Sequence, residues 1–358
     1  MIIEDLLTEL VQKKGSDLHI SSSLPPVMRI DGNLMRHNSK VLSSDEVEDL
    51  LFPMLSNEQR RRLEQEWELD FSYGIEGVGR FRVNMYKDKG NYAAAFRTIN
   101  ANAPQLEDLG MPDVVKKMAE KPRGLILVTG PTGSGKSTTL AAMIDYINRT
   151  RAEHILTIED PVEFVHTSKK SIIHQRELGA DTRSFANALK SALREDPDII
   201  LVGEMRDHET IALALTAAET GHLVFGTLHT SSASQTVDRI IDVFPQGQQQ
   251  QIHIQLANSL VAVFSQTLLP RLNAAGEKEG RIMAQEIMVV NPAVANLIRE
   301  AKAAQIYSTI QTNQALGMQT LEMALANLYM NKLITLEDAL AKTSKPEELK
   351  RQINLVNK

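Results

Sequence analysis

The pattern of hydrophobic and polar positions in the N-terminal part switches between helical and strand spacing. Apolar residues recur every three or four positions over 3–11 and over 47–55, which predicts two amphipathic helices. The segments 80–84 and 92–99 alternate between apolar and polar residues, as half-buried strands do. Residues 1–98 are therefore predicted to form a separate small α/β domain.

Two local signals support this interpretation. Asp31-Gly32 separates two short alternating segments, which is typical of a tight hairpin turn. Ser43 and Glu46 have the spacing of a capping box at the start of the second helix.

A stretch with little periodicity, 99–112, follows and contains Pro104, Gly110 and Pro112, which predicts an interdomain linker. From 113 to about 270, apolar runs alternate with helical stripes. Such alternation predicts a parallel-sheet α/β core, because parallel strands are joined by helices that cover the sheet. The expected strands are 125–129, 154–159, 171–175, 199–203 and 223–227, and the expected helices are 136–149, 184–195, 208–220 and 233–242.

The C-terminal part, from about 281 to 358, is expected to be a helical region of the same domain, which spans 113–358. Asn291-Pro292 has the residue types of a helix start, and further helices fit 319–331 and 335–342.

The composition excludes several classes. A length of 358 residues suits about two domains. The absence of cysteine excludes disulfides and thiolate metal sites, and a net charge of −6 argues against a broad nucleic-acid surface. No apolar run reaches the roughly 18 residues of a membrane span, and the N-terminus lacks a signal-peptide pattern. We therefore expect a cytoplasmic protein with no direct membrane insertion and no nucleic-acid partner.

The strongest chemical signal lies between an apolar run and a helical stripe, and it fits the phosphate-loop pattern G-x-x-x-x-G-K-[ST]. Glycines let backbone N–H groups surround a phosphate, and the helix N-terminus adds its positive dipole end. Lys136 is expected to reach the β- and γ-phosphates, and the Ser137 hydroxyl to bind Mg²⁺. A chance glycine-rich turn is the alternative. The predicted nucleotide-binding residues are Gly130, Pro131, Thr132, Gly133, Ser134, Gly135, Lys136, Ser137 and Thr138.

Acidic residues follow two of the predicted strands. Glu204 comes after the apolar run 199–202, where it can hold Mg²⁺ through water or polarise the attacking water. Glu159, Asp160 and Glu163 lie in and after strand 154–159, and each is a candidate base for hydrolysis. The alternative for all of them is a solvated acid at a strand end.

Basic residues give weaker signals. His222 and His229 bracket a predicted strand, and a histidine there can sense a γ-phosphate. Arg82 and Arg97 lie on predicted N-terminal strands. For each of these residues an ordinary solvated or core position is the alternative.

Taken together, these motifs resemble those of the secretion-type ATPases, and within them the twitching-motility (retraction) ATPases of type IV pili. The likeness runs over nearly the whole chain. It is carried by Ser16–His19 with Arg29–Gly32, by the phosphate loop, by an acidic box at 157–164, by the Walker B region 195–207 and by a His box at 220–230.

The resemblance implies a PAS-like N-terminal domain and a RecA-like ATPase domain, assembled as a homohexamer with sites at the junctions between domains and subunits. Glu163 corresponds to the proposed catalytic glutamate, and Glu204 supports the metal and water. Arg82 and Arg97 match two arginines that reach the nucleotide phosphates, and His229 belongs to the His box. How Glu163 and Glu204 divide their roles stays open.

The implied function is a hexameric, ATP- and Mg²⁺-dependent motor for pilus retraction. It would work at the cytoplasmic face of the inner membrane, with a pilus platform protein and a paralogous retraction ATPase as partners. The alternatives are a pilus-extension or type II secretion ATPase, a nucleic-acid translocase and a small-molecule kinase. Extension ATPases carry a longer N-terminal region and a tetracysteine zinc site, so this cysteine-free chain fits the retraction branch better.

The family's C-terminal helix motif corresponds to Ala293–Glu300, with Ala295 in place of an arginine. Val294, Leu297 and Ile298 share one face of this helix. Such a stripe is either core or a surface that couples the motor to its partner. The resemblance favours a helix needed for retraction but not for hydrolysis.

Overall fold

The structure, a computed structural model, describes residues 2–99 and 103–356. Two compact units make up the chain. The first contains Met1–Ala103, Pro161–His166 and Glu177–Asp181, and the second contains the remaining residues from Pro104 onward. The division after Ala103 falls within the predicted linker 99–112, of which 100–102 lie outside the described residues.

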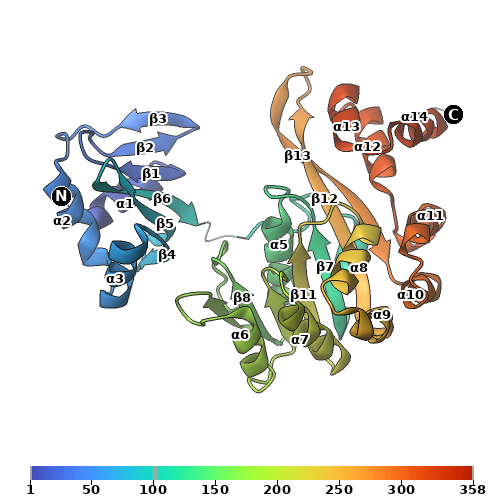
Figure 1. The fold of residues 1–358 in the computed structure, drawn as a ribbon. Coiled ribbons are helices and arrows are strands. Elements are labelled where there is room, and N and C mark those ends of the chain that lie inside the picture. Colours follow the sequence, from blue (N-terminus) through green and yellow to red (C-terminus); the bar gives the residue numbers. More distant parts are fainter. Residues whose placement is uncertain (1, 100–102, 357–358) are drawn as a thin grey trace. The chain divides into compact units, whose positions relative to one another are not determined.

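The first unit is built on a six-stranded sheet with the strand order β3-β2-β1-β6-β5-β4 (Figure 1). Every pairing in this sheet is antiparallel. Its described helices are α1 (Ile3–Gln12), α2 (Ser44–Leu51), the 3-10 turn η1 (Phe52–Met54) and α3 (Asn57–Glu66), and its strands are β1 (Asp17–Ile20), β2 (Val27–Ile30), β3 (Asn33–Arg36), β4 (Glu68–Ile75), β5 (Gly79–Asp88) and β6 (Asn91–Ile99).

The local signals in this unit are confirmed. Asp31 and Gly32 form a two-residue turn with φ of +48° and +80°, which closes the hairpin of β2 and β3. Ser43 caps α2, and both hydrogen bonds of the capping box with Glu46 are present.

The second unit contains a seven-stranded sheet with the order β13-β12-β7-β11-β10-β8-β9. The strands β12, β7, β11, β10 and β8 run parallel, and β13 pairs antiparallel with β12. The predicted parallel-sheet core is thus confirmed. The strands are β7 (Gly124–Thr129), β8 (His154–Glu159), β9 (Ile172–Glu177), β10 (Ile199–Val202), β11 (Leu223–Leu228), β12 (Leu260–Leu272) and β13 (Lys278–Val289).

Helices cover both faces of this sheet, so its central strands are apolar on both sides. On β7, Leu125 and Leu127 face a core that contains side chains of the helices from α6 to α10, whereas Ile126 and Val128 face α4 and α5. The bounds of these helices are α4 (Asp113–Ala119), α5 (Lys136–Thr150), α6 (Phe185–Ala192), α7 (His208–Glu219), α8 (Ala233–Asp242), α9 (Gln246–Ser259) and α10 (Pro292–Arg299).

The predicted linker begins one residue too early, because Ile99 still belongs to β6, and the first unit extends beyond the predicted 1–98 to include Pro161–His166 and Glu177–Asp181. The start of the C-terminal helical region was also predicted wrongly. The helical region begins at Pro292 and not at about 281, because residues 278–289 form β13, which pairs with β12.

Among the described residues, no helix has the length and apolar character that a membrane span requires. The later elements are η2 (Ala303–Gln305), α11 (Ile306–Thr312), η3 (Gln314–Leu316), α12 (Leu321–Met330), α13 (Leu336–Lys342) and α14 (Pro346–Val356).

The apolar stripe of α10 belongs mostly to the core. Asn291 caps the helix as predicted, by accepting a hydrogen bond from the Val294 N–H. Val294 and Ile298 are fully buried, and Leu297 is partly buried against the same core cluster. The expectation that this stripe is a partner surface is therefore wrong for Val294 and Ile298, whose side chains stabilise the ATPase unit.

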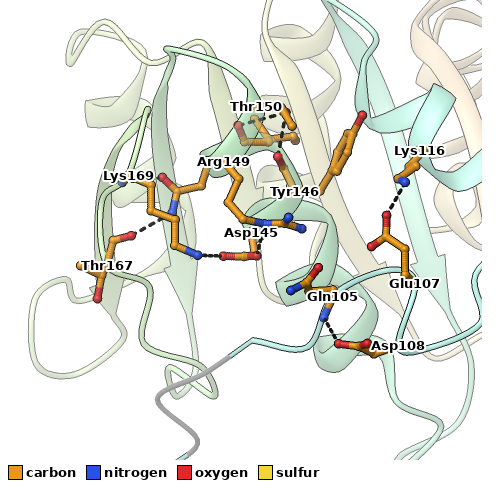
Figure 2. A network of polar contacts seen from close by, with 12 residues as sticks. Gln105, Glu107, Asp108, Lys116, Asp145, Tyr146, Arg149, Thr150, Thr167 and Lys169 are labelled. Carbon is orange, nitrogen blue, oxygen red and sulfur yellow. Dashed lines mark hydrogen bonds and ion pairs between the residues drawn. The ribbon is translucent and has the colours of Figure 1, made fainter.

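Polar contacts anchor the far end of α5, the helix that follows the phosphate loop (Figure 2). The Asp145 carboxylate accepts hydrogen bonds from Arg149 Nε at 2.7 Å and from Lys169 Nζ at 2.5 Å. Asn148 is fully buried and binds the backbone of Thr167 and Lys169. These contacts fix α5 against the segment that leads into β9.

A buried carboxyl group holds the start of α8. Glu286 on β13 is 4% exposed, and its Oε1 accepts a hydrogen bond from the Ala233 N–H at 2.7 Å. Burial raises the pKa of Glu286 to about 7 from an ordinary 4.5, and the charge of Glu322 adds to the rise.

Replacing Glu286 by Gln is expected to change how stability depends on pH. Folding raises the pKa of Glu286. The stability that this carboxyl group contributes to the folded chain is therefore complete below pH 4.5 and is lost as pH rises through about 7. Between these two pH values the free energy of unfolding of the wild type should fall by about 3 kcal/mol. The Gln variant should not show this fall, because its side chain does not titrate. Denaturant unfolding across this pH range measures it.

Glu279→Gln, at an exposed position on the same strand, is the matched control. Parallel pH profiles for the wild type and the Glu286→Gln variant would contradict the assigned pKa.

Candidate active site

The phosphate loop connects the buried strand β7 to α5. Gly130 has φ of +143° and Gly135, the N-cap of α5, has φ of +88°. Side chains rarely tolerate either conformation, which explains the glycines at these positions. The loop thus turns sharply at both ends and presents the N-terminus of α5, which favours anions.

Three predicted ligand residues lie at the start of α5. Lys136 Nζ donates to the carbonyl oxygens of Gly130 at 2.8 Å and Pro131 at 3.2 Å, so the ammonium group lies over the loop. Ser137 and Thr138 follow in the first turn and are half-buried. A cation and hydroxyl groups therefore lie where the phosphate loop passes into α5.

Glu204 follows β10 at the carboxyl edge of the sheet and has two basic partners. Its Oε2 accepts a hydrogen bond from Arg206 Nη2 at 2.6 Å, and its Oε1 accepts one from His229 Nε2 at 3.0 Å. His229 lies just after β11, the neighbouring strand. The structure therefore joins the Walker B region and the His box in one cluster.

The charge of Glu204 follows from these contacts. The hydrogen bond and charge of Arg206 lower the pKa of Glu204, although burial opposes the shift. Glu204 is therefore a carboxylate at neutral pH, which suits it to hold a metal-bound water.

The acids near β8 belong to two different units. Glu159 ends β8 and accepts hydrogen bonds from the Thr157 hydroxyl at 2.6 Å and the Gln175 amide at 3.2 Å. Asp160 is exposed in the same unit. Glu163 belongs to the first unit, where its side chain is exposed.

The donor set fits Mg²⁺. Among the described residues, His, Asp and Glu side chains nowhere gather in a group of three or more that could hold a metal ion by itself. Mg²⁺ in nucleotide sites needs only one or two protein oxygens, because phosphates and waters complete its shell. The Ser137 hydroxyl and the Glu204 carboxylate are oxygen ligands of the required kind.

The first unit brings Arg82 and Arg97 together. Arg82 on β5 lies directly opposite Arg97 on β6 in the antiparallel register. Both line a hollow of about 280 Å³ together with Asp17, Asp70 and Asn84. Phe81 and Val83, the neighbours of Arg82, point into the core instead.

Each arginine has an acidic partner in this hollow. Arg97 Nε donates to Asp17 Oδ1 at 2.9 Å, and Arg82 Nη2 lies 3.6 Å from Asp70 Oδ2. Burial would raise the pKa of Asp17, but hydrogen bonds from Ser16 and Arg97 outweigh it and lower the pKa. Because like charges directly opposite on a sheet repel, the paired arginines favour an anion between them.

Two residues beside Glu204 and the phosphate loop, in the second unit, were not among the predicted site residues. Arg206 lies within the predicted Walker B region 195–207, and the structure pairs its guanidinium with the Glu204 carboxylate. Gln266 on β12 contacts the phosphate loop, and no motif in the sequence singles it out.

Comparisons with known proteins identify the family of this chain. The family described as Type II/IV secretion system protein matches residues 1–338. The chain belongs to this family. Relatives named as retraction ATPases match this chain over almost the whole length of both proteins. Within the family, the chain is therefore a secretion-type ATPase.

Three relatives illustrate this likeness. The type IV pilus retraction ATPase PilT of Pseudomonas aeruginosa is 53% identical over 97% of this chain and 99% of its own. A twitching motility protein of Neisseria gonorrhoeae is 52% identical over 97% of this chain and 92% of its own. A crystal structure of the pilus retraction motor PilT with bound ADP matches with a TM-score of 0.90 and 48% identity, over 98% of this chain and 99% of that one.

Lys136→Ala is expected to abolish ATP hydrolysis and leave the fold intact. Lys136 lies over the loop, and removing one charge that stabilises the transferred phosphoryl group should cost roughly 10²-fold or more in rate. Phosphate release and thermal melting of the purified variant test both parts.

Lys190→Ala, which removes an exposed lysine that pairs with Glu209, is the matched control and should keep full activity. Phosphate release near the wild-type rate in the Lys136 variant would refute the assigned role.

Proposed function

We propose that this chain hydrolyses ATP to power the retraction of type IV pili. The observation that carries the proposal is its 53% identity to a pilus retraction ATPase along 99% of that protein. The phosphate loop, Glu204 and His229 at one edge of the second unit supply the hydrolytic part of the proposal.

In the proposed reaction, water attacks the γ-phosphorus, its oxygen forms the new bond, and the bond to the β-γ bridging oxygen breaks to release ADP. Glu163 orients the water and accepts its proton. Lys136 neutralises charge that develops on the phosphoryl oxygens. Mg²⁺, when bound, supplies further charge neutralisation, and Ser137 and Glu204 would hold it, Glu204 through water.

Arg82 and Arg97 are proposed to complete the site within a homohexamer. They lie on a unit that contains no phosphate loop of its own, and both are largely exposed. A ring would let the first unit of one subunit present them to a nucleotide held by a second unit. Bound phosphate would then replace Asp17 and Asp70 as their partner.

The proposed setting is the cytoplasmic face of the inner membrane, where the ring would act on a pilus platform protein with a paralogous ATPase as a further partner. Pilus extension or type II secretion is the nearest alternative, because these systems use the same ATPase core. Nucleic-acid translocation is less well supported by a chain with a net charge of −6.

Mixing variants tests whether the arginines act between subunits. Arg82→Ala and Arg97→Ala should each lower turnover by roughly 10³-fold, as the loss of an arginine that stabilises a transferring phosphate does. Rings that combine an arginine variant with Lys136→Ala should recover part of the activity, because some sites then have every part. ATPase assays on co-purified rings measure it.

Arg36→Ala, at an exposed position on β3 of the same unit, is the control and should not change turnover. If subunits that demonstrably co-assemble show no recovery, the arginines do not act in trans.

Deletion of the gene in its host tests the direction of force. Retraction predicts cells with many pili and no twitching motility, because pili extend but are not withdrawn. A strain that carries Glu163→Gln should look the same, since the carboxamide cannot accept the proton. Electron microscopy and a subsurface twitching assay measure both traits.

Complementation with the wild-type gene should restore motility. Bald cells after deletion would instead favour the extension ATPase, and normal pili with normal motility would refute a role in pilus dynamics.

A further inference from the structure

Below the phosphate loop, three buried polar side chains are joined to one another by hydrogen bonds. Gln266 on β12 and Gln285 on β13 are each 3% exposed, and Thr139 on α5 is 1% exposed. Burying an amide costs free energy unless its N–H and C=O groups have hydrogen-bond partners, so the partners of these side chains show why burial is tolerated here.

Gln266 makes three side-chain hydrogen bonds. Its Nε2 donates to the backbone carbonyl of Ser134 at 2.9 Å, within the phosphate loop. Its Oε1 accepts from the Thr139 hydroxyl at 3.0 Å and from Gln285 Nε2 at 3.3 Å. One amide thus joins the loop, the helix that follows it and the neighbouring strand.

The orientation of this amide follows from its partners. A backbone carbonyl can only accept, so the nitrogen of Gln266 must face Ser134. The Gln266 oxygen then faces Gln285, whose Nε2 can only donate. Gln285 in turn presents its Nε2 to that oxygen and adds a hydrogen bond to the orientation that Ser134 sets.

The strand β12 also lies against both ends of the loop. A Cβ atom on Gly130 would come within 2.2 Å of the Gln266 backbone oxygen, and one on Gly135 would lie 3.3 Å from Gln266 Nε2. The hydroxyls of Ser265 and Thr129, which precede Gln266 and Gly130, lie 2.7 Å apart.

The hydrogen bond to Ser134 has a consequence for the next peptide group. In a planar trans peptide the C=O and the following N–H point in opposite directions. Because Gln266 binds the Ser134 carbonyl from the side of β12, the Gly135 N–H points away from β12. Backbone N–H groups at this turn are those that bind phosphates in such loops.

We propose that Gln266 is a positioning residue for nucleotide binding, which holds the phosphate loop in its binding conformation, and that the hydrogen bond from Gln285 supports its amide. The proposal rests on nucleotide binding at this loop. It assigns Gln266 no contact with the nucleotide and no step in hydrolysis.

Gln266→Leu tests the proposal, because leucine is of similar size and has no polar atoms. The dissociation constant for ADP should rise roughly tenfold, as expected when a buried carbonyl and hydroxyl lose their partner. The KM for ATP should rise similarly with a smaller change in kcat, since the loop holds phosphates in both the ground state and the transition state. Titration calorimetry with ADP and steady-state kinetics measure both.

Gln266→Glu provides a second variant if the leucine protein does not fold. A buried glutamic acid keeps an acceptor for Thr139 and can donate to Ser134 only while protonated. Burial raises carboxyl pKa values, so the ADP affinity of this variant, relative to the wild type, should fall as pH rises from about 6 to 8. A structural role alone predicts no such pH dependence of binding.

Gln352→Leu is the matched control, because Gln352 is also a buried glutamine, and it donates to Glu348 within α14. It should lower the melting temperature without changing ADP affinity. Wild-type affinity for ADP in Gln266→Leu, or a pH-independent affinity ratio in Gln266→Glu, would overturn the proposal.

These experiments distinguish a failure of the role of Gln266 from a failure of the proposed function. A wild-type chain that fails to bind ADP would contradict the ATPase site itself. A deletion strain with normal pili and normal motility would contradict the role in retraction and leave the role of Gln266 in ADP binding unaffected.

Discussion

The parallel pairing of β7, β11, β10 and β8 is the constraint on which the candidate site depends. Parallel strands end at the same edge of a sheet, so the residues that follow them meet there. The phosphate loop follows β7, His229 follows β11, Glu204 follows β10, and Glu159 ends β8. Residues spread over about a hundred positions of the chain thereby share one edge. The helices on both faces exclude water from the strands and leave this edge accessible.

The same edge explains the charges of the site. Arg206 and His229 surround Glu204 and keep it ionised, while the helix N-terminus and Lys136 supply positive charge at the loop. A site for a nucleotide with Mg²⁺ needs both signs close together, because the metal requires anionic oxygens and the phosphates require cations. The first unit carries a separate concentration of positive charge in Arg82 and Arg97. We propose that assembly into a ring combines the two.

Much of the fold could be predicted because its signals are local. The apolar runs of β7 and β10, the turn at Asp31-Gly32 and the capping box at Ser43 each depend on residues a few positions apart. The strands β12 and β13 escaped prediction, since Ser265, Gln266 and Glu286 interrupt their apolar runs. Those polar residues are buried only because their partners come from distant segments: Thr129 binds Ser265, and Ala233 binds Glu286.

By itself, the sequence determined the chemistry available to this protein: a phosphate loop with Lys136 and Ser137, acids after apolar strands, and arginines on strands that alternate between apolar and polar residues. These are properties of residue type and short spacing, which are already set before the chain folds. Only the tertiary structure decided which groups meet. It paired Glu204 with His229 and Arg206, set Arg82 opposite Arg97, placed Val294 and Ile298 in the core, and brought Gln266 beneath the loop. The reason is physical: a hydrogen bond extends about 3 Å in space, and only the packing of the sheet brings segments more than a hundred residues apart within that reach.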